Sequence, residues 1–221
     1  MRTNTEPELR TENWIELLAS QAEPAGPRRA GPLIARLLSW GVAASLALML
    51  VAYGPRPDLA EVAMLPMFWL KAGAPLAIAL AGVVLLHRLG RPGVRGGRAW
   101  WGIALPVLLL WLVAAAQWLA TAPPERPPLL WGETWRGCVF NIAFIALPSF
   151  LAALATLRQL APTRPRAAGA AAGVLAGGAG AFAYAFHCPE LAAPFLAVWY
   201  VLGMAMPVVA GALIGPRLLR W

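Results

Sequence analysis

The chain has 221 residues, of which 60% are hydrophobic and 13% are charged, and its mean hydropathy is +0.64. Soluble globular domains carry about 25% charged residues, so this composition excludes an ordinary soluble protein and indicates a membrane protein. The formal net charge of +8 would suit a nucleic-acid-binding protein. The basic residues are divided among the connections between apolar segments, however, and this distribution argues against direct binding to nucleic acid.

Residues 1–22 differ in composition from the rest of the chain and are predicted to form a small cytoplasmic segment. Half of the ten acidic residues lie within this segment or next to it. Thr5 with Glu8 three positions later matches a capping box, which predicts the start of a helix. The helix would carry an apolar stripe and a separate acidic face. The stripe is predicted at Leu9, Trp14, Ile15, Leu17 and Leu18, and the acidic face at Glu8, Glu12 and Glu16.

Three interpretations fit this N-terminal segment. It could be a polar tail, since like charges four residues apart weaken an isolated helix by about 0.2–0.5 kcal/mol. It could lie on the membrane, but its acidic face would be repelled by anionic lipids. The most specific hypothesis is an arm that binds a protein partner through a basic, partly apolar groove. Residues 23–32 are rich in Pro and Gly and form a linker that would let the arm reach this partner while tethered.

Residues 33–221 are predicted to form an all-α, polytopic domain of six transmembrane helices. A spanning helix needs about 20 consecutive apolar residues, and six stretches meet this requirement. Arg36 and Lys71 are the only charged residues inside them. We expect no cleavable signal peptide, because a long polar and Pro/Gly-rich segment precedes the first stretch. The six stretches are residues 33–53, 66–86, 101–120, 138–157, 167–186 and 191–214.

The basic residues predict the orientation of these helices. Fourteen of the eighteen lie on one side of the predicted topology, and the positive-inside rule places that side in the cytoplasm. Both termini are therefore predicted to be cytoplasmic. The opposite connections hold Arg56, Arg126 and Arg136. The fourteen residues are Arg2, Arg10, Arg28, Arg29, Arg36, Arg88, Arg91, Arg95, Arg98, Arg158, Arg164, Arg166, Arg217 and Arg220.

Two of the spans differ sharply in composition. Gly169, Gly173 and Gly177 recur every four residues in the fifth span, which is the spacing that lets a neighbouring helix approach closely. We therefore place the fifth span inside the bundle. The third span, residues 101–120, is rich in Leu, Val and Trp and is predicted to face lipid.

The connection between the fifth and sixth spans carries three residues that can bind metals or transfer protons or electrons, His187, Cys188 and Glu190. Pro189, in the same connection, is predicted to open the next helix. Cys138 opens the fourth span and Cys188 closes the fifth. Because those spans run in opposite directions, both thiols are predicted at the same outer level. They could be two small buried hydrophobes. Their shared level, next to His187 and Glu190, favours a redox site or a transient soft-metal site.

Lys71, near the outer end of the second span, is the one intramembrane charge that needs an explanation. The ordinary interpretation, which we favour, is that its side chain reaches toward the membrane surface. If it faces inward, it could lower the pKa of a thiol. His187 would then serve as a base or a third ligand, and Glu190 as a carboxylate near the thiols. We expect a shift at the outer end of the fifth span to reach Arg164 and Arg166 on the inner side.

No motif for catalysis or for a bound cofactor is present. His87 and His187 are predicted at opposite membrane surfaces, which excludes a haem held by both. The sequence contains no phosphate loop, HExxH motif or pair of intramembrane carboxylates, so neither an enzyme nor proton-coupled transport is indicated.

Several short motifs are spread over nearly the whole chain. They are Phe68-Trp69-Leu70-Lys71, residues 161–165 (APTRP), His187-Cys188-Pro189-Glu190, Trp199-Tyr200 with Gly203-Met204, and residues 215–221 (GPRLLRW). Together they resemble the NrsF-type membrane anti-sigma factors of bacteria. The resemblance implies a six-span inner-membrane protein whose cytoplasmic N-terminus holds an extracytoplasmic-function sigma factor inactive. It also implies release of that factor on an envelope, redox or heavy-metal signal, and the outer-side cysteines of the family match Cys138 and Cys188.

We therefore predict a signal-transducing regulator with three parts: the arm, the linker and the membrane domain. Its expected partners are an extracytoplasmic-function sigma factor and the lipid bilayer. The alternatives are a small-molecule or metal-ion permease and a purely structural membrane subunit.

Overall fold

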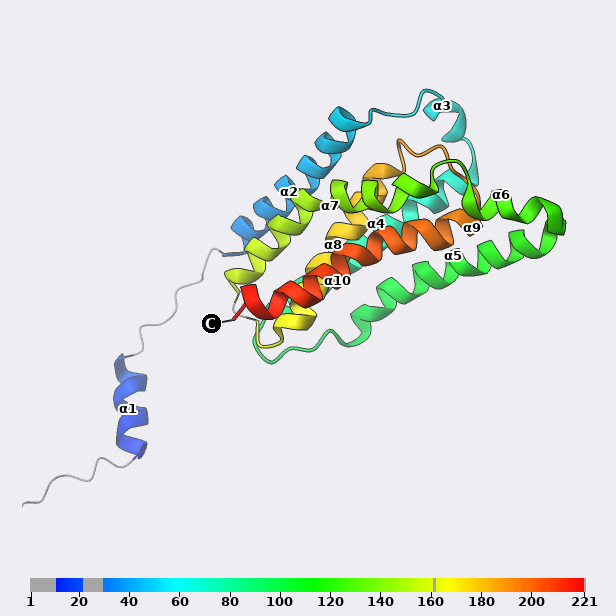
Figure 1. Cartoon of the computed structure of the whole chain (residues 1–221). Coiled ribbons are helices and arrows are strands. Elements are labelled where there is room, and N and C mark those ends of the chain that lie inside the picture. Colours follow the sequence, from blue (N-terminus) through cyan, green and yellow to red (C-terminus); the bar gives the residue numbers. More distant parts are fainter. Residues whose placement is uncertain (1–10, 22–29, 161, 221) are drawn as a thin grey trace, which may run out of the picture. The chain divides into compact units, whose positions relative to one another are not determined.

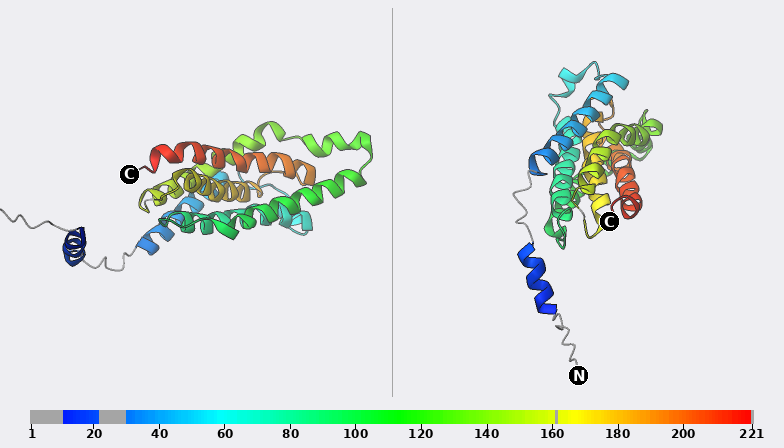
Figure 2. Two further views of the ribbon diagram at one scale, coloured as in Figure 1. Left: turned by 90° about the horizontal axis from the view of Figure 1, so that it is seen from below. Right: turned by 90° about the vertical axis from the view of Figure 1, so that its left-hand side faces the viewer.

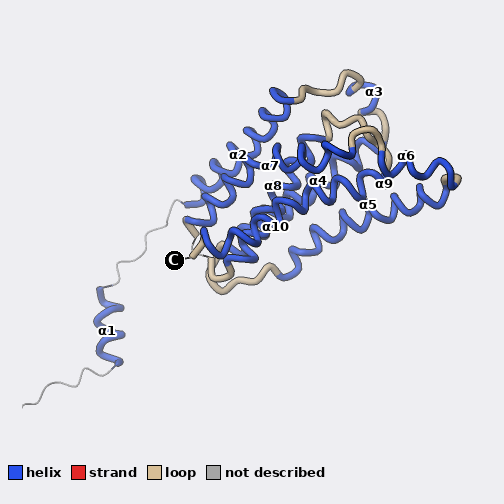
Figure 3. The backbone as a smooth tube through the Cα atoms, viewed as in Figure 1, coloured by secondary structure: helices blue, strands red, loops and turns tan. Residues whose placement is uncertain are grey.

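The computed structural model describes residues 11–21, 30–160 and 162–220, and all regular structure in these residues is helical (Figures 1 and 3). This confirms the predicted all-α class. The chain divides into two compact units, residues 1–34 and 35–221, and we describe each by itself.

The first unit contains helix α1, Thr11–Gln21. Four apolar side chains on α1, those of Trp14, Ile15, Leu17 and Leu18, are exposed, and Trp14 is 48% exposed. Glu16 is exposed as well. The predicted capping-box residues Thr5 and Glu8 lie outside the described residues, as do Leu9 and the side chain of Glu12.

The second unit contains six helical stretches that are long and apolar enough to cross a membrane, which is the number predicted. Helix α5, Trp101–Ala120, coincides with the third predicted span, and helix α2 begins at Ala30, three residues before the first predicted span. The long helices are α2 Ala30–Ala52, α4 Pro66–Leu89, α5 Trp101–Ala120, α7 Trp135–Arg158, α8 Pro165–Tyr184 and α10 Val201–Leu218. The short ones are α3 Leu59–Val62, η1 Gly97–Trp100, η2 Pro123–Glu125, α6 Arg126–Trp131, α9 Ala193–Phe195 and the π-helical turn η3 Leu196–Tyr200.

Helix α8 lies at the centre of the bundle and packs against α4, α7 and α10 (Figure 2). Its glycines explain why three helices can approach it so closely. A Cβ atom at Gly177 would lie 2.5 Å from the carbonyl oxygen of Met204 on α10. Gly178 would meet α4 in the same way, and Gly180 would meet α7. The predicted glycine seam is thus confirmed, with α10 as the neighbour of Gly169, Gly173 and Gly177.

Helices α8 and α5 differ in burial as predicted. In the most apolar stretch of α8, 83% of the residues are buried, whereas the share is 11% for the span that contains α5. The Ala- and Gly-rich helix is therefore interior, and the Leu- and Trp-rich helix buries only Leu110 and Ala114.

The start of the last span corrects one prediction. Pro189 does not open a helix, because α9 begins at Ala193 with Pro194 in its first turn. Proline is tolerated at that position, since the first turn leaves its N–H groups unpaired. Residues 185–192 form the connection between α8 and α9, and we call this connection the cysteine loop.

Candidate functional site

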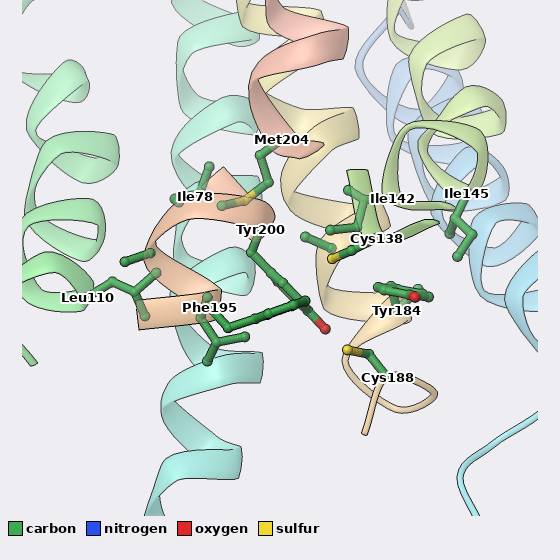
Figure 4. Close-up of a cluster of buried hydrophobic side chains, with 14 of the residues drawn as sticks. Ile78, Leu110, Cys138, Ile142, Ile145, Tyr184, Cys188, Phe195, Tyr200 and Met204 are labelled. Atoms are coloured by element: carbon green, nitrogen blue, oxygen red, sulfur yellow. The ribbon is translucent and has the colours of Figure 1, made fainter. Parts of the chain in front are cut away.

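The cysteine loop brings the two cysteines of the chain together. Cys138 lies in the first turn of α7, and Cys188 lies in the loop, where its amide donates to the carbonyl of Tyr184 at the end of α8. Both cysteines are free and fully buried. They belong to one cluster of buried side chains, in which Cys138, Cys188 and the hydroxyl of Tyr200 point toward one another (Figure 4).

Polar groups surround Cys188 in this otherwise apolar cluster. Thr134 Oγ1 lies 4.0 Å from its sulfur atom. The Tyr200 hydroxyl is buried and has no hydrogen-bond partner among the described residues. The neighbouring Cys138 thiol lowers the pKa of the Cys188 thiol, burial opposes this effect, and the nearby Lys71 ammonium lowers the pKa further. The groups around Cys188 thus favour its thiolate.

Lys71 points into the bundle, which corrects the expectation that it reaches the membrane surface. The residue is 1% exposed. Its Nζ atom donates to the carbonyl oxygens of Cys188 and Glu190, at 2.5 and 2.8 Å, and lies 5.5 Å from the centre of the Tyr200 ring. A buried ammonium is costly unless it is hydrogen-bonded. The loop carbonyls and the aromatic ring supply the partners that water would otherwise provide.

Arg56, a residue that the sequence analysis assigned to no site, also holds the cysteine loop. It is 9% exposed, and its Nη1 atom donates to the carbonyl oxygens of Cys188 and Pro189, at 3.2 and 3.3 Å. Its Nε and Nη2 atoms donate to the two carboxylate oxygens of Asp58, each at 2.7 Å. The signal that could have revealed it is a basic residue on the predicted outer side, two positions before an acidic one.

Glu190 joins the loop to the start of α7. Its Oε1 atom accepts hydrogen bonds from the amides of Glu133 and Thr134, at 2.7 and 3.1 Å, and from Thr134 Oγ1 at 3.2 Å. A carboxylate beside a helix N-terminus is stabilised by the helix dipole. Gly132 leaves room for it, because a Cβ atom there would lie 2.6 Å from this carboxylate. The structure gives Glu190 a positioning role near the thiols.

His187 faces the end of α2. Its Nδ1 atom lies 2.9 Å from the carbonyl oxygen of Gly54, so this nitrogen is the donor. Its ring packs beside those of Tyr53 and Tyr184, with centroids 5.3 and 5.7 Å away. Within the described ranges, no three His, Cys, Asp or Glu side chains gather in a way that could hold a metal ion. The structure therefore does not bring His187 to the cysteines as a third ligand.

Comparison with known proteins gives consistent matches. The family model described as "Negative regulator of sigma F" (NrsF) matches residues 18–221. The "Probable anti-sigma-F factor NrsF" of Azospira oryzae is 41% identical over 213 residues, covering 96% of this chain and all of that protein. The "Anti-sigma-F factor NrsF" of Caulobacter vibrioides is 40% identical over 219 residues, with the same coverage of each chain. No solved structure matches the chain significantly.

Proposed function

Since this chain belongs to the NrsF family of negative regulators of sigma F, we propose that it is a membrane-bound anti-sigma factor. It sequesters an extracytoplasmic-function sigma factor and releases it when Cys138 and Cys188 are oxidised. The observation that carries the proposal is the pair of adjacent, buried thiols, one of them in a loop held by Lys71 of α4, by the connection after α2 and by the start of α7. The two relatives are regulators by name rather than enzymes.

The membrane placement rests on hydropathy and charge. Six helical stretches are long and apolar enough to span a bilayer, and fourteen of the eighteen basic residues lie at one end of them in the sequence pattern. The positive-inside rule favours both termini in the cytoplasm and the cysteine loop on the other side of a bacterial inner membrane. That side is the oxidising one, where disulfides form and persist.

The arm, residues 1–22, is the proposed sigma-binding element. Helix α1 exposes four apolar side chains, and Glu16 adds a negative charge to the same short helix. The four are Trp14, Ile15, Leu17 and Leu18. An amphipathic helix of this kind suits a groove on a partner protein. Leu9, Glu8 and Glu12 extend the proposed surface beyond the part of the chain that the structure describes.

The signal is proposed to enter as a two-electron oxidation. Cys138 and Cys188 together lose two electrons and two protons as their sulfur atoms join in a disulfide. A diazene such as diamide takes up both electrons and both protons and becomes the corresponding hydrazine. Lys71, His187 and Glu190 act as positioning residues for the loop in this proposal.

Affinity purification of the full chain from native membranes tests the binding step. The parent chain should capture a soluble sigma factor and lose it after treatment with diamide. Replacing both Cys138 and Cys188 by Ser should leave capture intact and abolish the release. If diamide releases the sigma factor from this double variant as fully as from the parent, the signal enters elsewhere.

The arm is tested separately by replacing Trp14, Leu17 and Leu18 with Ala. Each side chain contributes about 1–3 kcal/mol if it is a buried contact at the interface. Capture should therefore be lost and the target genes should be expressed without a stimulus, while the amount of protein in the membrane stays the same. Capture by this triple variant at the parent's level would exclude the arm as the binding element.

A further inference from the structure

Helix α2 is attached to the rest of the bundle along a single narrow strip. Only 17% of its most apolar stretch is buried, and the buried residues Gly41, Ser45 and Met49 recur every four positions. Ser45 Oγ lies 2.8 Å from Ser149 Oγ on α7. Gly41 brings α2 close to the backbone of α7, and Leu38 and Leu46 are partly buried beside the strip. The other faces of α2 are exposed, so the helix interlocks with the bundle on one side only.

The connection after α2 is held to the cysteine loop by four polar contacts. The Arg56 amide donates to the carbonyl of Phe186 at 2.9 Å, and His187 Nδ1 donates to the carbonyl of Gly54. The Arg56 guanidinium makes the other two, to the carbonyls of Cys188 and Pro189. All four contacts join residues 54–56 to residues 186–189. A movement of the cysteine loop is therefore expected to move this connection with it.

The chain between α2 and Arg56 is short and stiff. Helix α2 ends with the Gly54 amide donating to the carbonyl of Met49 at 3.2 Å, and Gly54 has φ +71°, as a helix-ending glycine does. Pro55 follows and fixes its own φ. Asp58 holds the guanidinium from the other side. A displacement of the loop carbonyls is therefore passed to α2 rather than absorbed by the connection.

We propose that Arg56 is the positioning residue through which the state of the cysteine pair reaches helix α2, and that α2, which the linker joins to the arm, carries the signal. This inference rests on the proposed function. A disulfide would require the Cα atoms of Cys138 and Cys188 to lie within about 7 Å, so linkage fixes where Cys188 lies. The carbonyl of Cys188, one of the oxygens that Arg56 contacts, moves with it.

The route expected from the sequence, along α8 to Arg164 and Arg166, is less suited to this task. Backbone atoms of α4, α7 and α10 lie against the glycines of α8, so α8 cannot shift unless three helices shift with it. Helix α2 is better suited. The linker joins the arm to its N-terminal end, a narrow strip holds it to the bundle, and polar contacts attach its C-terminal end to the cysteine loop.

The first experiment measures how strongly oxidation changes sigma binding. The full chain in lipid nanodiscs is titrated with the captured sigma factor, with and without diamide. Allosteric coupling typically changes affinity about 5- to 150-fold, and the parent should fall in this range. Arg56→Met should still form the disulfide, measured by loss of maleimide labelling. The ratio of its sigma-factor affinities without and with diamide, which we call the affinity ratio, should nevertheless fall to about one. Arg56→Lys should restore part of the ratio, and Arg136→Met, whose guanidinium lies over the Trp135 ring, should keep all of it.

The second experiment needs neither a variant of Arg56 nor a sigma factor. Hydrogen exchange of the parent chain is followed over residues 53–58, where the Arg56 amide is protected by the carbonyl of Phe186. Diamide should change the exchange rate in this segment as the connection moves with the loop, and the double serine variant should show no such change.

Each outcome bears on one of the two proposals. An unchanged affinity ratio in Arg56→Met, or unchanged exchange in the oxidised parent, overturns the role of Arg56. A parent chain that binds no sigma factor overturns the proposed function instead, while the exchange measurement still decides whether oxidation reaches the end of α2.

Discussion

Helices α8 and α2 are both apolar, yet they are held in different ways. Helix α8 contacts three neighbours through its backbone, because its glycines remove the side chains that would keep them apart. Helix α2 contacts the bundle through one strip of residues and through polar groups after its end. The difference separates a rigid frame from an element whose position depends on a few hydrogen bonds.

The largest effect is expected from filling the contact between α8 and α10. Gly173→Leu would place side-chain atoms against the backbone of Pro207 and Val208, and overpacking of this kind should cost about 3 kcal/mol. The matched control is Gly73→Leu on α4, where a Cβ atom meets nothing within 4 Å. Unfolding in mixed detergent micelles measures both. Equal stability of the two variants would contradict the frame role of α8.

A smaller loss is expected from removing the buried cation of α4. Lys71→Met leaves the carbonyl of Glu190 without its donor, and an unsatisfied buried acceptor costs about 1–3 kcal/mol. Tyr200→Phe is the contrasting change, since it removes a hydroxyl that has no partner among the described residues. We expect it to leave the free energy of unfolding unchanged or to raise it, because a buried hydroxyl without a partner is costly. A reversed order of the two losses would overturn this account of the loop.

The strip on α2 should respond more weakly still. Ser45→Ala removes the hydrogen bond to Ser149 and should cost about 1 kcal/mol. Ser39→Ala changes an exposed serine of the same helix and should cost nothing measurable. If Ser45→Ala destabilises the bundle as much as Gly173→Leu, then α2 belongs to the rigid frame.

The smallest expected effect is a shift in the pH dependence of thiol modification. Because the pKa of Cys188 is lowered, its thiolate is present above that lowered pKa and is lost as the pH falls through it. A small methanethiosulfonate should therefore modify Cys188 at pH values below the ordinary thiol pKa of about 8.5. Lys71→Met should move the Cys188 profile to higher pH, as followed by mass spectrometry. A profile that stays in place would show that Lys71 does not act on the thiol.

The sequence predicted those features that depend on periodicity. Hydropathy located residues 101–120 as a span, and the four-residue glycine spacing located the closest helix contact. The sequence also indicated that the turn after the fifth span, with His187, Cys188 and Glu190, would contribute to the functional site. These signals are local, because each can be read from one helix alone.

The inward direction of Lys71 could not be predicted in this way. Its partners are carbonyls of Cys188 and Glu190, more than a hundred residues away in sequence, and main-chain carbonyls leave no mark in a sequence. Arg56 was missed for the same reason. The prediction that Pro189 opens the last helix is wrong, because the rule that a proline fits a first turn holds equally for Pro194, which occupies that position in α9.

Lys71 and the Arg56 guanidinium hold the cysteine loop through main-chain oxygens. The contact of Arg56 with Asp58 lies outside the loop. Every amino acid supplies a main-chain oxygen, whatever its side chain. The side chains at positions 188 and 189 can therefore change over evolutionary time while the loop keeps its attachment to α4 and to the connection after α2. One ancestral scaffold could in this way acquire, exchange or lose a sensing chemistry without rebuilding the bundle that supports it.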